Sequence, residues 1–423
     1  MKFFMRFFIL FISFIYLAQP ENIFAQRGNQ HENFLKKDDA VLLADPDGKI
    51  ILSKNAGKKL IPASTLKILT CLAAFHCLGE DFRFRTEFYL DNNSNLKVKG
   101  YGDPLLMSEC LIKIAEVFGE RLGKETGKIK SIVLDSSFFT YPVVISGISS
   151  SFEPYDAPNG ALCVNFNTVC FKKSDNFKNP GGTPDRKYVS AEPQTPLLPF
   201  IQERIRKSGL SRGRIVLSRQ GNECTLYAGR LLNYFLKGQG VKTDAGTNDS
   251  IVTGNINKET DRLVYTYVSM FSLEQVVKKL FEYSNNFMAN QLLLATGAQV
   301  YGPPATIKKG VDAVLDYTKN MLKIEDIVFV EGSGISRQNT VSAKAMDKIL
   351  KAFEPFHNLM RHEDGVFFKT GTLKGIRTRA GYIENRKGKL YRFVVFMNTP
   401  ADSREESMKQ IMDILCGLVN RGD

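Results

Sequence analysis

The sequence predicts an α+β fold in which an antiparallel sheet is covered by helices and interrupted by a large β-rich insertion. Three observations support this prediction. A helical apolar pattern follows residue 61, helical patterns resume at Ser272, and three strand-like runs precede a closing helix. Residues 82–253 show instead short strands punctuated by Gly and Pro, with few long helices. We therefore predict one domain formed by residues 26–81 and 254–423, with an insertion of one or two small domains at 82–253.

The first 25 residues have the pattern of a secretory signal peptide. Lys2 and Arg6 precede an apolar run, and the small residue Ala25 stands at the expected cleavage point. We predict cleavage after about Ala25 and export to the periplasm or cell envelope. An uncleaved N-terminal anchor is the alternative, although the apolar run is short for a membrane span.

The composition limits the partners and cofactors that we expect. A net charge of +13 favours polyanions, and no nucleic-acid reader motif accompanies it. We therefore expect peripheral association with anionic wall polymer or phospholipid headgroups, and no nucleic-acid binding. The four histidines are scattered without metal-ligand spacing, so we expect no metal and no cofactor. Seven cysteines are too sparse for a disulfide scaffold.

The first predicted elements of the domain are a hairpin and a helix. Apolar runs at residues 41–44 and 49–52 flank an Asp-Pro-Asp-Gly turn signal, which predicts the hairpin. The helix follows in the stretch Ile-Pro-Ala-Ser-Thr-Leu-Lys at residues 61–67, where Pro62 suits a first helical position. The insertion then shows strand-like runs at residues 85–90, 129–134 and 214–217.

The second half of the chain predicts helices followed by a meander. Ser272 and Gln275 have the spacing of a capping box, which predicts a helix to about Tyr283. A break at residues 284–286 precedes a second helix, 287–296, which Gly297 is expected to end. The remaining predicted elements are a helix at 307–322, a strand at 327–330, a helix at 342–353, strands at 366–372, 379–384 and 390–398, and a closing helix from Ser403.

The pair Ser64 and Lys67 is the first candidate for chemistry. The two residues lie one helical turn apart, so their side chains share a face and can hydrogen-bond. A serine hydroxyl is a poor nucleophile unless a base takes its proton, and an amine in a partly dry pocket can be that base. We therefore expect Ser64 as nucleophile and Lys67 as base, although a Ser-x-x-Lys alone is a weak signal.

Two later segments supply the other groups that acyl transfer needs. Lys369 is expected to lower the pKa of Lys67, because a nearby like charge disfavours the protonated form. Ser284 is expected to pass a proton between Lys67 and the leaving nitrogen, and Asn286 to hold both Lys67 and a substrate carbonyl. Taken singly, Ser284 also fits a purely structural role as a helix cap, Asn286 as a turn residue and Lys369 as a charged residue at a strand edge.

The strand that carries Lys369 is expected to bind substrate. The hydroxyls of Thr370 and Thr372, together with Lys369, form a carboxylate-binding edge around Gly371. The backbone N–H groups of Ser64 and Thr372 are expected to form the oxyanion hole. Ser-x-x-Lys, Ser-x-Asn and Lys-Thr-Gly in this order are the signature of serine β-lactamases and penicillin-binding proteins.

Further segments resemble the class C low-molecular-mass penicillin-binding proteins of the penicillin-binding protein 4 type, the D-alanyl-D-alanine carboxypeptidase/endopeptidase family S13. The resemblance covers most of the chain after residue 25. It implies the β-lactamase/DD-peptidase transpeptidase fold, cell-wall stem peptides as substrate and covalent capture by β-lactams. The segments that carry it, besides the three motifs, are residues 102–106 (GDPLL), 155–158 (YDAP), 331–337 (EGSGISR), 369–375 (KTGTLKG) and 380–382 (AGY).

Three departures from the family pattern bear on specificity. Glu331 stands where an aspartate is usual, and the stretch between Arg337 and Lys369 is shorter. The resemblance implies that Arg337 helps to bind the diamino acid of the stem peptide. It aligns Asn165 with an aspartate of the same subsite, so we expect a carboxylate contact through Arg337 and weaker selection at the amine.

Two rival functions share the fold. A serine β-lactamase would hydrolyse the acyl-enzyme quickly, but Phe152-Glu153-Pro154 precedes Ser284, which is the wrong order for a class A deacylating glutamate. The large insertion also argues against a β-lactamase. A catalytically idle wall-binding protein is the second rival, and retention of every motif residue argues against it. The sequence is compatible with release of a terminal D-alanine and with cross-link cleavage, because both reactions use the same acyl donor.

Overall fold

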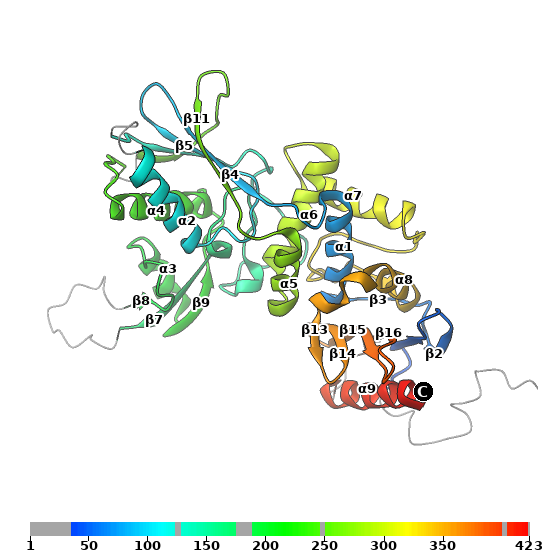
Figure 1. Ribbon diagram of the computed structural model, residues 1–423. Coiled ribbons are helices and arrows are strands. Elements are labelled where there is room, and N and C mark those ends of the chain that lie inside the picture. The colour runs from blue at the N-terminus through cyan, green and yellow to red at the C-terminus, as the bar shows by residue number, and fades with distance from the viewer. Residues whose placement is uncertain (1–34, 123–127, 175–187, 246–249, 400–403, 422–423) are drawn as a thin grey trace, which may run out of the picture.

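The computed structural model describes residues 35–122, 128–174, 188–245, 250–399 and 404–421. The signal peptide predicted at residues 1–25 lies outside them. Figure 1 shows the elements in two groups, with a sheet and its helices on one side and the elements of the insertion on the other. Within the described ranges, no helix is both long and apolar enough to cross a membrane.

The main sheet of the described chain has six strands in the order β13-β14-β15-β16-β1-β2, and every neighbouring pair is antiparallel. The predicted N-terminal hairpin and the predicted C-terminal meander are both confirmed. Because β1 pairs with β16, the two ends of the chain complete one sheet. The strands are β1 (Ala40–Ala44), β2 (Ile50–Lys54), β13 (Arg361–Glu363), β14 (Val366–Leu373), β15 (Ile376–Glu384) and β16 (Leu390–Met397).

Both faces of strand β1 in this sheet are buried. Side chains alternate along a strand, so Val41 and Leu43 of β1 pack with α9 (Arg404–Arg421), whereas Leu42 and Ala44 face the main helical cluster. All five residues of β1 are therefore buried. The continuous apolar run of β1 thus reflects a strand covered on two sides, with α9 on one and helices on the other (Figure 1).

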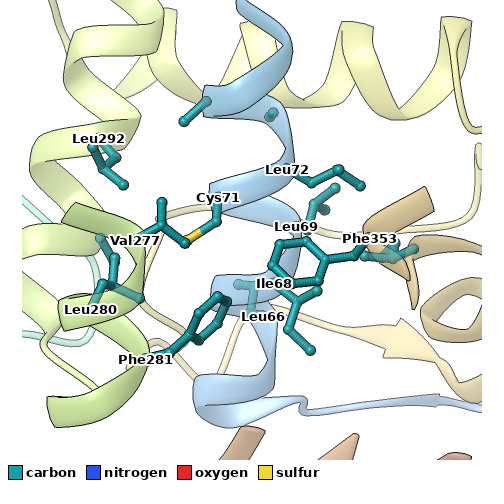
Figure 2. Packing of buried hydrophobic residues seen from close by; sticks show 14 of the residues in the cluster. Leu66, Ile68, Leu69, Cys71, Leu72, Val277, Leu280, Phe281, Leu292 and Phe353 are labelled. Carbon is teal, nitrogen blue, oxygen red and sulfur yellow. The ribbon is translucent and has the colours of Figure 1, made fainter. Parts of the chain in front are cut away.

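The helix α1 (Lys67–Leu78) is the centre of the helical layer. Its first nine residues are all buried, which leaves it without a solvent face. Figure 2 shows α1 between Val277, Leu280 and Phe281 of α5, Leu292 of α6 and Phe353 of α8. The surrounding helices are α5 (Leu273–Tyr283), α6 (Asn286–Tyr301), α7 (Ile307–Asn320) and α8 (Ala343–Phe353), and a short pair of strands, β3 (Lys59–Leu60) and β12 (Val341–Ser342), joins the layer to the serine turn.

The insertion contains two sheets that share one core. A five-stranded mixed sheet has the order β10-β6-β5-β4-β11, and a three-stranded antiparallel sheet has the order β8-β7-β9. Buried residues of both sheets belong to a single hydrophobic cluster. The elements are β4 (Arg85–Leu90), β5 (Leu96–Gly100), α2 (Ser108–Val117), β6 (Ile132–Asp135), β7 (Thr168–Lys173), β8 (Tyr188–Ser190), α3 (Ile201–Ser208), β9 (Arg212–Val216), α4 (Glu223–Gly238), β10 (Ile251–Thr253) and β11 (Arg262–Val268).

The end of the insertion differs from the sequence-based boundary. Strand β11 lies beyond residue 253, yet it pairs along its length with β4 in the five-stranded sheet. We therefore propose to place the return to the catalytic domain after Val268. The 16-residue helix α4 was also not expected from the short, punctuated runs of the insertion.

The capping box of Ser272 and Gln275 is confirmed, and α5 ends at Tyr283 as predicted. The predicted helix end at Gly297 is wrong, because α6 continues to Tyr301. A Cβ atom at Gly297 would lie 2.5 Å from the Gly310 nitrogen, so this glycine lets α6 and α7 approach closely. The strand predicted at residues 327–330 is reduced to one bridge between Val328 and Thr340.

A buried carboxylate fastens the C-terminal helix to the sheet. Asp39 is fully buried and accepts hydrogen bonds from the backbone N–H groups of Lys36, Asn398 and Thr399. Its second oxygen lies 2.7 Å from Nη1 of Arg404, the first residue of α9. The pair is almost entirely removed from water, so neither partner can be lost without leaving the other unsatisfied.

We therefore predict that Asp39→Ala lowers the free energy of unfolding by about 3–5 kcal/mol, because it leaves the Arg404 charge buried and unpaired. Urea unfolding followed by circular dichroism measures this change. The matched control is Asp38→Ala, since Asp38 is exposed and its partner Lys58 is too. A loss at Asp39 no larger than the loss at Asp38 would contradict the prediction.

Candidate active site

Ser64 lies in a 3₁₀ turn, Ala63–Leu66, that leads directly into α1. The carbonyl oxygen of Pro62 accepts hydrogen bonds from the hydroxyls of Thr65 and Thr378, each at 2.7 Å. The turn is thereby fastened both to its own helix and to β15 of the sheet. The serine sits in a tighter turn than the predicted α-helix, which begins three residues later.

Two glycines allow other segments to approach this turn. A Cβ atom at Gly334 would lie 1.9 Å from the carbonyl oxygen of Ala63. A Cβ atom at Gly371 would lie 2.8 Å from the Ser64 nitrogen. Ala63 itself has a φ angle of +47°, which an L-residue adopts only when its surroundings enforce it. The nucleophile is therefore held rigidly between β14 and the loop that contains Gly334.

The amine of Lys67 contacts three oxygen atoms. It lies 2.8 Å from Oγ of Ser64, 2.8 Å from Oδ1 of Asn286 and 2.6 Å from the carbonyl oxygen of Ser333. The side chain is fully buried. The structure thus brings the predicted amide, Asn286, to the predicted nucleophile and base, although it lies more than 200 positions after them in the chain.

The pKa of Lys67 lies well below that of an ordinary lysine. Burial is the largest cause, the positive charge of Lys369 is the second, and the nearby carboxylate of Glu331 opposes both. The predicted effect of Lys369 on the pKa of Lys67 is confirmed, but it is second to burial. Desolvation by the helices around α1 contributes more than the second cation does.

An uncharged Lys67 fits its three neighbours. A neutral amine has two N–H donors and one lone pair, whereas an ammonium has three donors. Asn286 Oδ1 and the Ser333 carbonyl can accept the two N–H bonds, because neither atom has a proton to give. The lone pair is then left for the hydroxyl proton of Ser64, which is the geometry that a general base requires.

A second lysine–serine pair lines the same site. Lys369 on β14 is buried, and its amine donates to Oγ of Ser284 and to the carbonyl of Thr370, each at 2.7 Å. Burial lowers the pKa of Lys369 to about 8. Ser284 has a left-handed φ of +51° at the end of α5, and Asn286 opens α6. The structure pairs Ser284 with Lys369 rather than with Lys67.

Sequence analysis missed the structural role of Glu331. Its fully buried carboxylate accepts hydrogen bonds from the backbone N–H groups of Ser333, Gly334 and Ser336 and from the side chain of Asn339. These bonds fix the loop whose Ser333 carbonyl holds the Lys67 amine. The replacement of aspartate by glutamate was visible in the sequence, but the group of donors around it was not.

The catalytic residues open into a cleft of about 730 Å³. Ser64, Ser284, Asn286 and Thr372 line it, so both halves of the domain reach the same cavity. The backbone of Gly371 packs directly on Ser64, and Thr372 is the next residue on the strand. This arrangement supports the predicted pair of oxyanion-hole N–H groups. Residues 373–377, Arg404 and Glu405 line the far end of the cleft.

The residues predicted to contact the diamino acid separate in the structure. Arg337 is exposed, and its guanidinium donates to the carbonyl of Lys374 at the rim of the cleft. Asn165 is fully buried in the insertion, where its amide exchanges hydrogen bonds of 2.9 Å with Ser108. The assignment of Asn165 to the substrate subsite is therefore corrected: its side chain is part of a core network and does not line the cleft.

Tyr155 is the residue through which the insertion reaches the cleft. Its side chain is about half exposed and lines the cavity, and its carbonyl accepts a hydrogen bond of 3.3 Å from the Asn286 amide. The neighbouring Asp156 is buried and accepts from Ser149 and Ser151. The Tyr-Asp-Ala-Pro segment was noted in the sequence, but nothing there pointed to its side chain as a wall of the cleft.

The described residues contain no group of three or more side chains suited to hold a metal ion. All seven cysteines are free thiols. A buried amine whose lone pair faces a hydroxyl, on a helix packed against an antiparallel sheet, defines a serine acyl-transfer enzyme with the fold of penicillin-binding proteins and serine β-lactamases.

The family follows from comparison with known proteins. The model of the D-Ala-D-Ala carboxypeptidase 3 (S13) family matches residues 35–362 and 360–418. The chain belongs to this family. It is 25% identical over 409 residues to the D-alanyl-D-alanine carboxypeptidase DacB of Haemophilus influenzae, with 83% of each chain covered. It is 24% identical over 416 residues to a D-alanyl-D-alanine carboxypeptidase of an Actinomadura species, covering 83% of this chain and 76% of that one.

Solved structures confirm the predicted fold class. Penicillin-binding protein 4 of Haemophilus influenzae superposes with a TM-score of 0.68 at 21% identity, covering 88% of this chain and 92% of that chain. A predatory endopeptidase of Bdellovibrio bacteriovorus, acylated by penicillin G, superposes with a TM-score of 0.52 at 16% identity, covering 90% and 92%.

The two lysine pKa values predict a bell-shaped pH profile for acylation by a D-alanyl-D-alanine peptide. The rate rises with pH as Lys67 loses its proton, and it falls above about pH 8 as Lys369 loses the charge that binds the terminal carboxylate. Single-turnover acylation rates measure the profile. A peptide with an amidated terminus serves as control, because it should lose the alkaline decline. An unchanged decline with the amide would contradict this assignment.

Proposed function

We propose that this protein is an exported serine-type D-Ala-D-Ala carboxypeptidase or DD-endopeptidase that cleaves peptidoglycan stem peptides through an acyl-enzyme on Ser64. Membership of the S13 family and similarity to named D-alanyl-D-alanine carboxypeptidases support it. The observation that carries the proposal is the buried Lys67 amine 2.8 Å from the Ser64 hydroxyl. Terminal release and cross-link cleavage share one acyl donor, so the proposal includes both.

Acylation begins when Lys67 takes the proton of Ser64 while Oγ forms a bond to the carbonyl carbon of the penultimate D-alanine. The carbonyl oxygen becomes an oxyanion, which the backbone N–H groups of Ser64 and Thr372 stabilise. Each such donor contributes about 3 kcal/mol to the transition state. The peptide C–N bond then breaks, and the proton held by Lys67 passes to the leaving amine, which returns Lys67 to its neutral form. The proposed relay is the Ser284 hydroxyl, which is bonded to Lys369 before substrate binds.

Substrate binding and deacylation use the same groups. Lys369, with the hydroxyls of Thr370 and Thr372, binds the terminal carboxylate and fixes the scissile bond over Ser64. Water then attacks the ester carbonyl, giving up a proton to Lys67, and the serine leaves with a proton returned from that amine. A β-lactam is captured because its leaving nitrogen stays attached to the acyl group after the ring opens.

The cellular setting of this activity is part of the proposal. The N-terminal signal pattern supports export to the periplasm or cell envelope. The basic net charge supports peripheral contact with anionic wall or membrane surfaces. Both features suit an enzyme whose substrate is the cell wall.

We predict that brief incubation with benzylpenicillin adds the mass of one penicillin to the protein, on Ser64. The Ser64→Ala variant should form no adduct, because it lacks the nucleophile. Lys67→Ala should acylate about 10²- to 10⁴-fold more slowly, because it lacks the base. Intact-protein and peptide mass spectrometry measure both results, and circular dichroism checks that the variants fold.

Failure of the wild type to form an adduct would contradict the proposal and favour a catalytically idle protein of the same fold. An adduct that hydrolyses within seconds would favour the β-lactamase alternative. An adduct on any residue other than Ser64 would also overturn the mechanism.

Specificity for the stem peptide rests on the far end of the cleft. Lys374 and Arg377 are cationic residues of the lining, and Arg337 is bonded to the Lys374 backbone beside them. Arg404 also lines this end, but its charge is paired with Asp39. The carboxylate lining this end is Glu405, whose oxygen lies 3.7 Å from the Arg377 guanidinium. This charge distribution supports our expectation of a carboxylate contact through Arg337 and weak selection for an amine.

We therefore predict that stem-like peptides with and without the side-chain amine react at similar rates. Removal of the side-chain carboxylate should lower kcat/KM by about fivefold, as expected for one exposed charge contact. Arg337→Ala should abolish this difference while leaving the carboxylate-free peptide unaffected. Steady-state kinetics with this peptide set measure the effect. Equal kcat/KM of the wild type for the peptides with and without the side-chain carboxylate would count against the role of Arg337.

A further inference from the structure

A second cavity, of about 800 Å³, lies between the insertion and the helices of the catalytic domain. Strands β4 and β5 supply one wall, and the C-terminal parts of α1 and α6 supply the other; in Figure 1 these elements meet where β4 runs toward α6. We call this cavity the interdomain groove. Its lining includes Arg83, Arg85, Lys99 and Lys258 among its charged residues, and Phe82, Tyr101 and Phe138 among its aromatic ones.

The interdomain groove is separate from the catalytic cleft. Lys67 opens α1 at the cleft, whereas Leu78 closes the same helix at the groove, about 17 Å further along the axis. Asn286 opens α6 at the cleft, and Ala298 of α6 lines the groove. A ligand in the groove would therefore contact the opposite ends of two helices that carry catalytic residues.

Two of the four cations in the groove are balanced by carboxylates. Arg85 Nε donates to Glu87 at 3.1 Å, and Lys99 donates to Asp135 at 2.8 Å. Each of these two ion pairs has a net charge of zero. The Arg85 guanidinium also covers the ring of Tyr101 at 4.3 Å, which fixes both groups in the wall.

The other two cations have no carboxylate bonded to them in the described chain. Arg83 Nη1 donates to the backbone carbonyls of Ser269 and Met270, which hold the guanidinium in place without neutralising it. Lys258 is exposed, and among the described residues no hydrogen bond or ion pair occupies its amine. Glu87 also lies within electrostatic range of Lys258, but Glu87 and Asp135 together balance only two of the four cations. The groove therefore presents a net positive charge to a ligand.

The aromatic residues give the groove apolar surfaces beside these charges. Phe82 and Phe138 are partly exposed, and Phe138 meets Tyr101 edge to face at a centroid distance of 4.9 Å. Rings that keep a fixed orientation offer flat faces to a ligand at little entropic cost. A ligand that matches this wall has extended apolar faces, hydrogen-bonding groups and negative charges spaced along it.

We propose that the interdomain groove is a second binding site and that its ligand is an anionic glycan, a chain of sugar rings that carries carboxylates. Sugar rings supply apolar faces for Phe82 and Phe138, and carboxylates pair with Arg83 and Lys258. The choice of a wall glycan rests on the proposed function, because a stem peptide in the catalytic cleft is attached to such a chain. Binding in the groove holds the polymer on the enzyme independently of the peptide being cleaved.

The test uses fluorescently labelled, peptide-free wall glycan, whose sugars carry lactyl carboxylates, and measures its anisotropy with the wild-type protein. We expect saturable binding that weakens with added salt. The double variant Arg83→Gln/Lys258→Glu should bind at least about fivefold more weakly. The matched control is Lys351→Glu, an exposed lysine on α8 that is not part of the groove lining. This control should bind as the wild type does.

Three results would overturn the inference: equal binding by the double variant and the wild type, equal loss in the Lys351→Glu control, or displacement of the glycan by benzylpenicillin. Chitin oligosaccharide, which lacks carboxylates, should bind more weakly than wall glycan, and equal binding would exclude the anionic requirement. Penicillin labelling is measured on every variant. If the wild type is labelled by penicillin but does not bind glycan, the inference of a glycan site is wrong and the proposed function stands. If it binds glycan but is not labelled, the proposed function is wrong and the glycan site stands.

Discussion

The amine of Lys67 is buried against Ser64, Asn286 and Ser333, and within the described chain no carboxylate forms an ion pair with it. Removing an ammonium from water costs several kcal/mol unless a counter-charge compensates it. The protein therefore favours the uncharged amine, whose lone pair faces the one neighbour with a proton to give. The mechanism that we propose depends on this single desolvated group.

The surrounding structure keeps that amine dry and in place. Helices α5, α6 and α8 enclose α1, so that the residues behind Lys67 are buried (Figure 2). The buried Glu331 holds the loop that offers the Ser333 carbonyl, and β15 holds the serine turn through Thr378. The insertion contributes the Tyr155 carbonyl, which orients the Asn286 amide. The loop of Glu331, strand β15 and the insertion, which are distant in the chain, thus together fix the hydrogen-bonding geometry around the Lys67 amine.

The sequence was sufficient to predict the sheet, most helices and a set of candidate catalytic residues that the structure brings together, because each rests on local spacing or on an ordered set of motifs. It was insufficient where a property arises only from packing. Burial outweighs Lys369 in lowering the pKa of Lys67, which requires the enclosing helices to be known. Asn165 aligned with a substrate residue but lies in a core, and Gly297 serves helix contact rather than a helix end. The pairing of β11 with β4 is likewise a long-range contact that no local pattern records.

The ionisation of Lys67 is the most direct test of this account. Lysine Cε resonances of ¹³C-labelled protein can be followed from acid to alkaline pH, with the Lys67 signal assigned by its absence from a Lys67→Arg variant. We expect that signal to have the chemical shift of an uncharged amine at neutral pH and to titrate well below the exposed lysines. A Lys67 signal that stays in the ammonium form until about pH 10, as in an ordinary exposed lysine, would contradict the central claim.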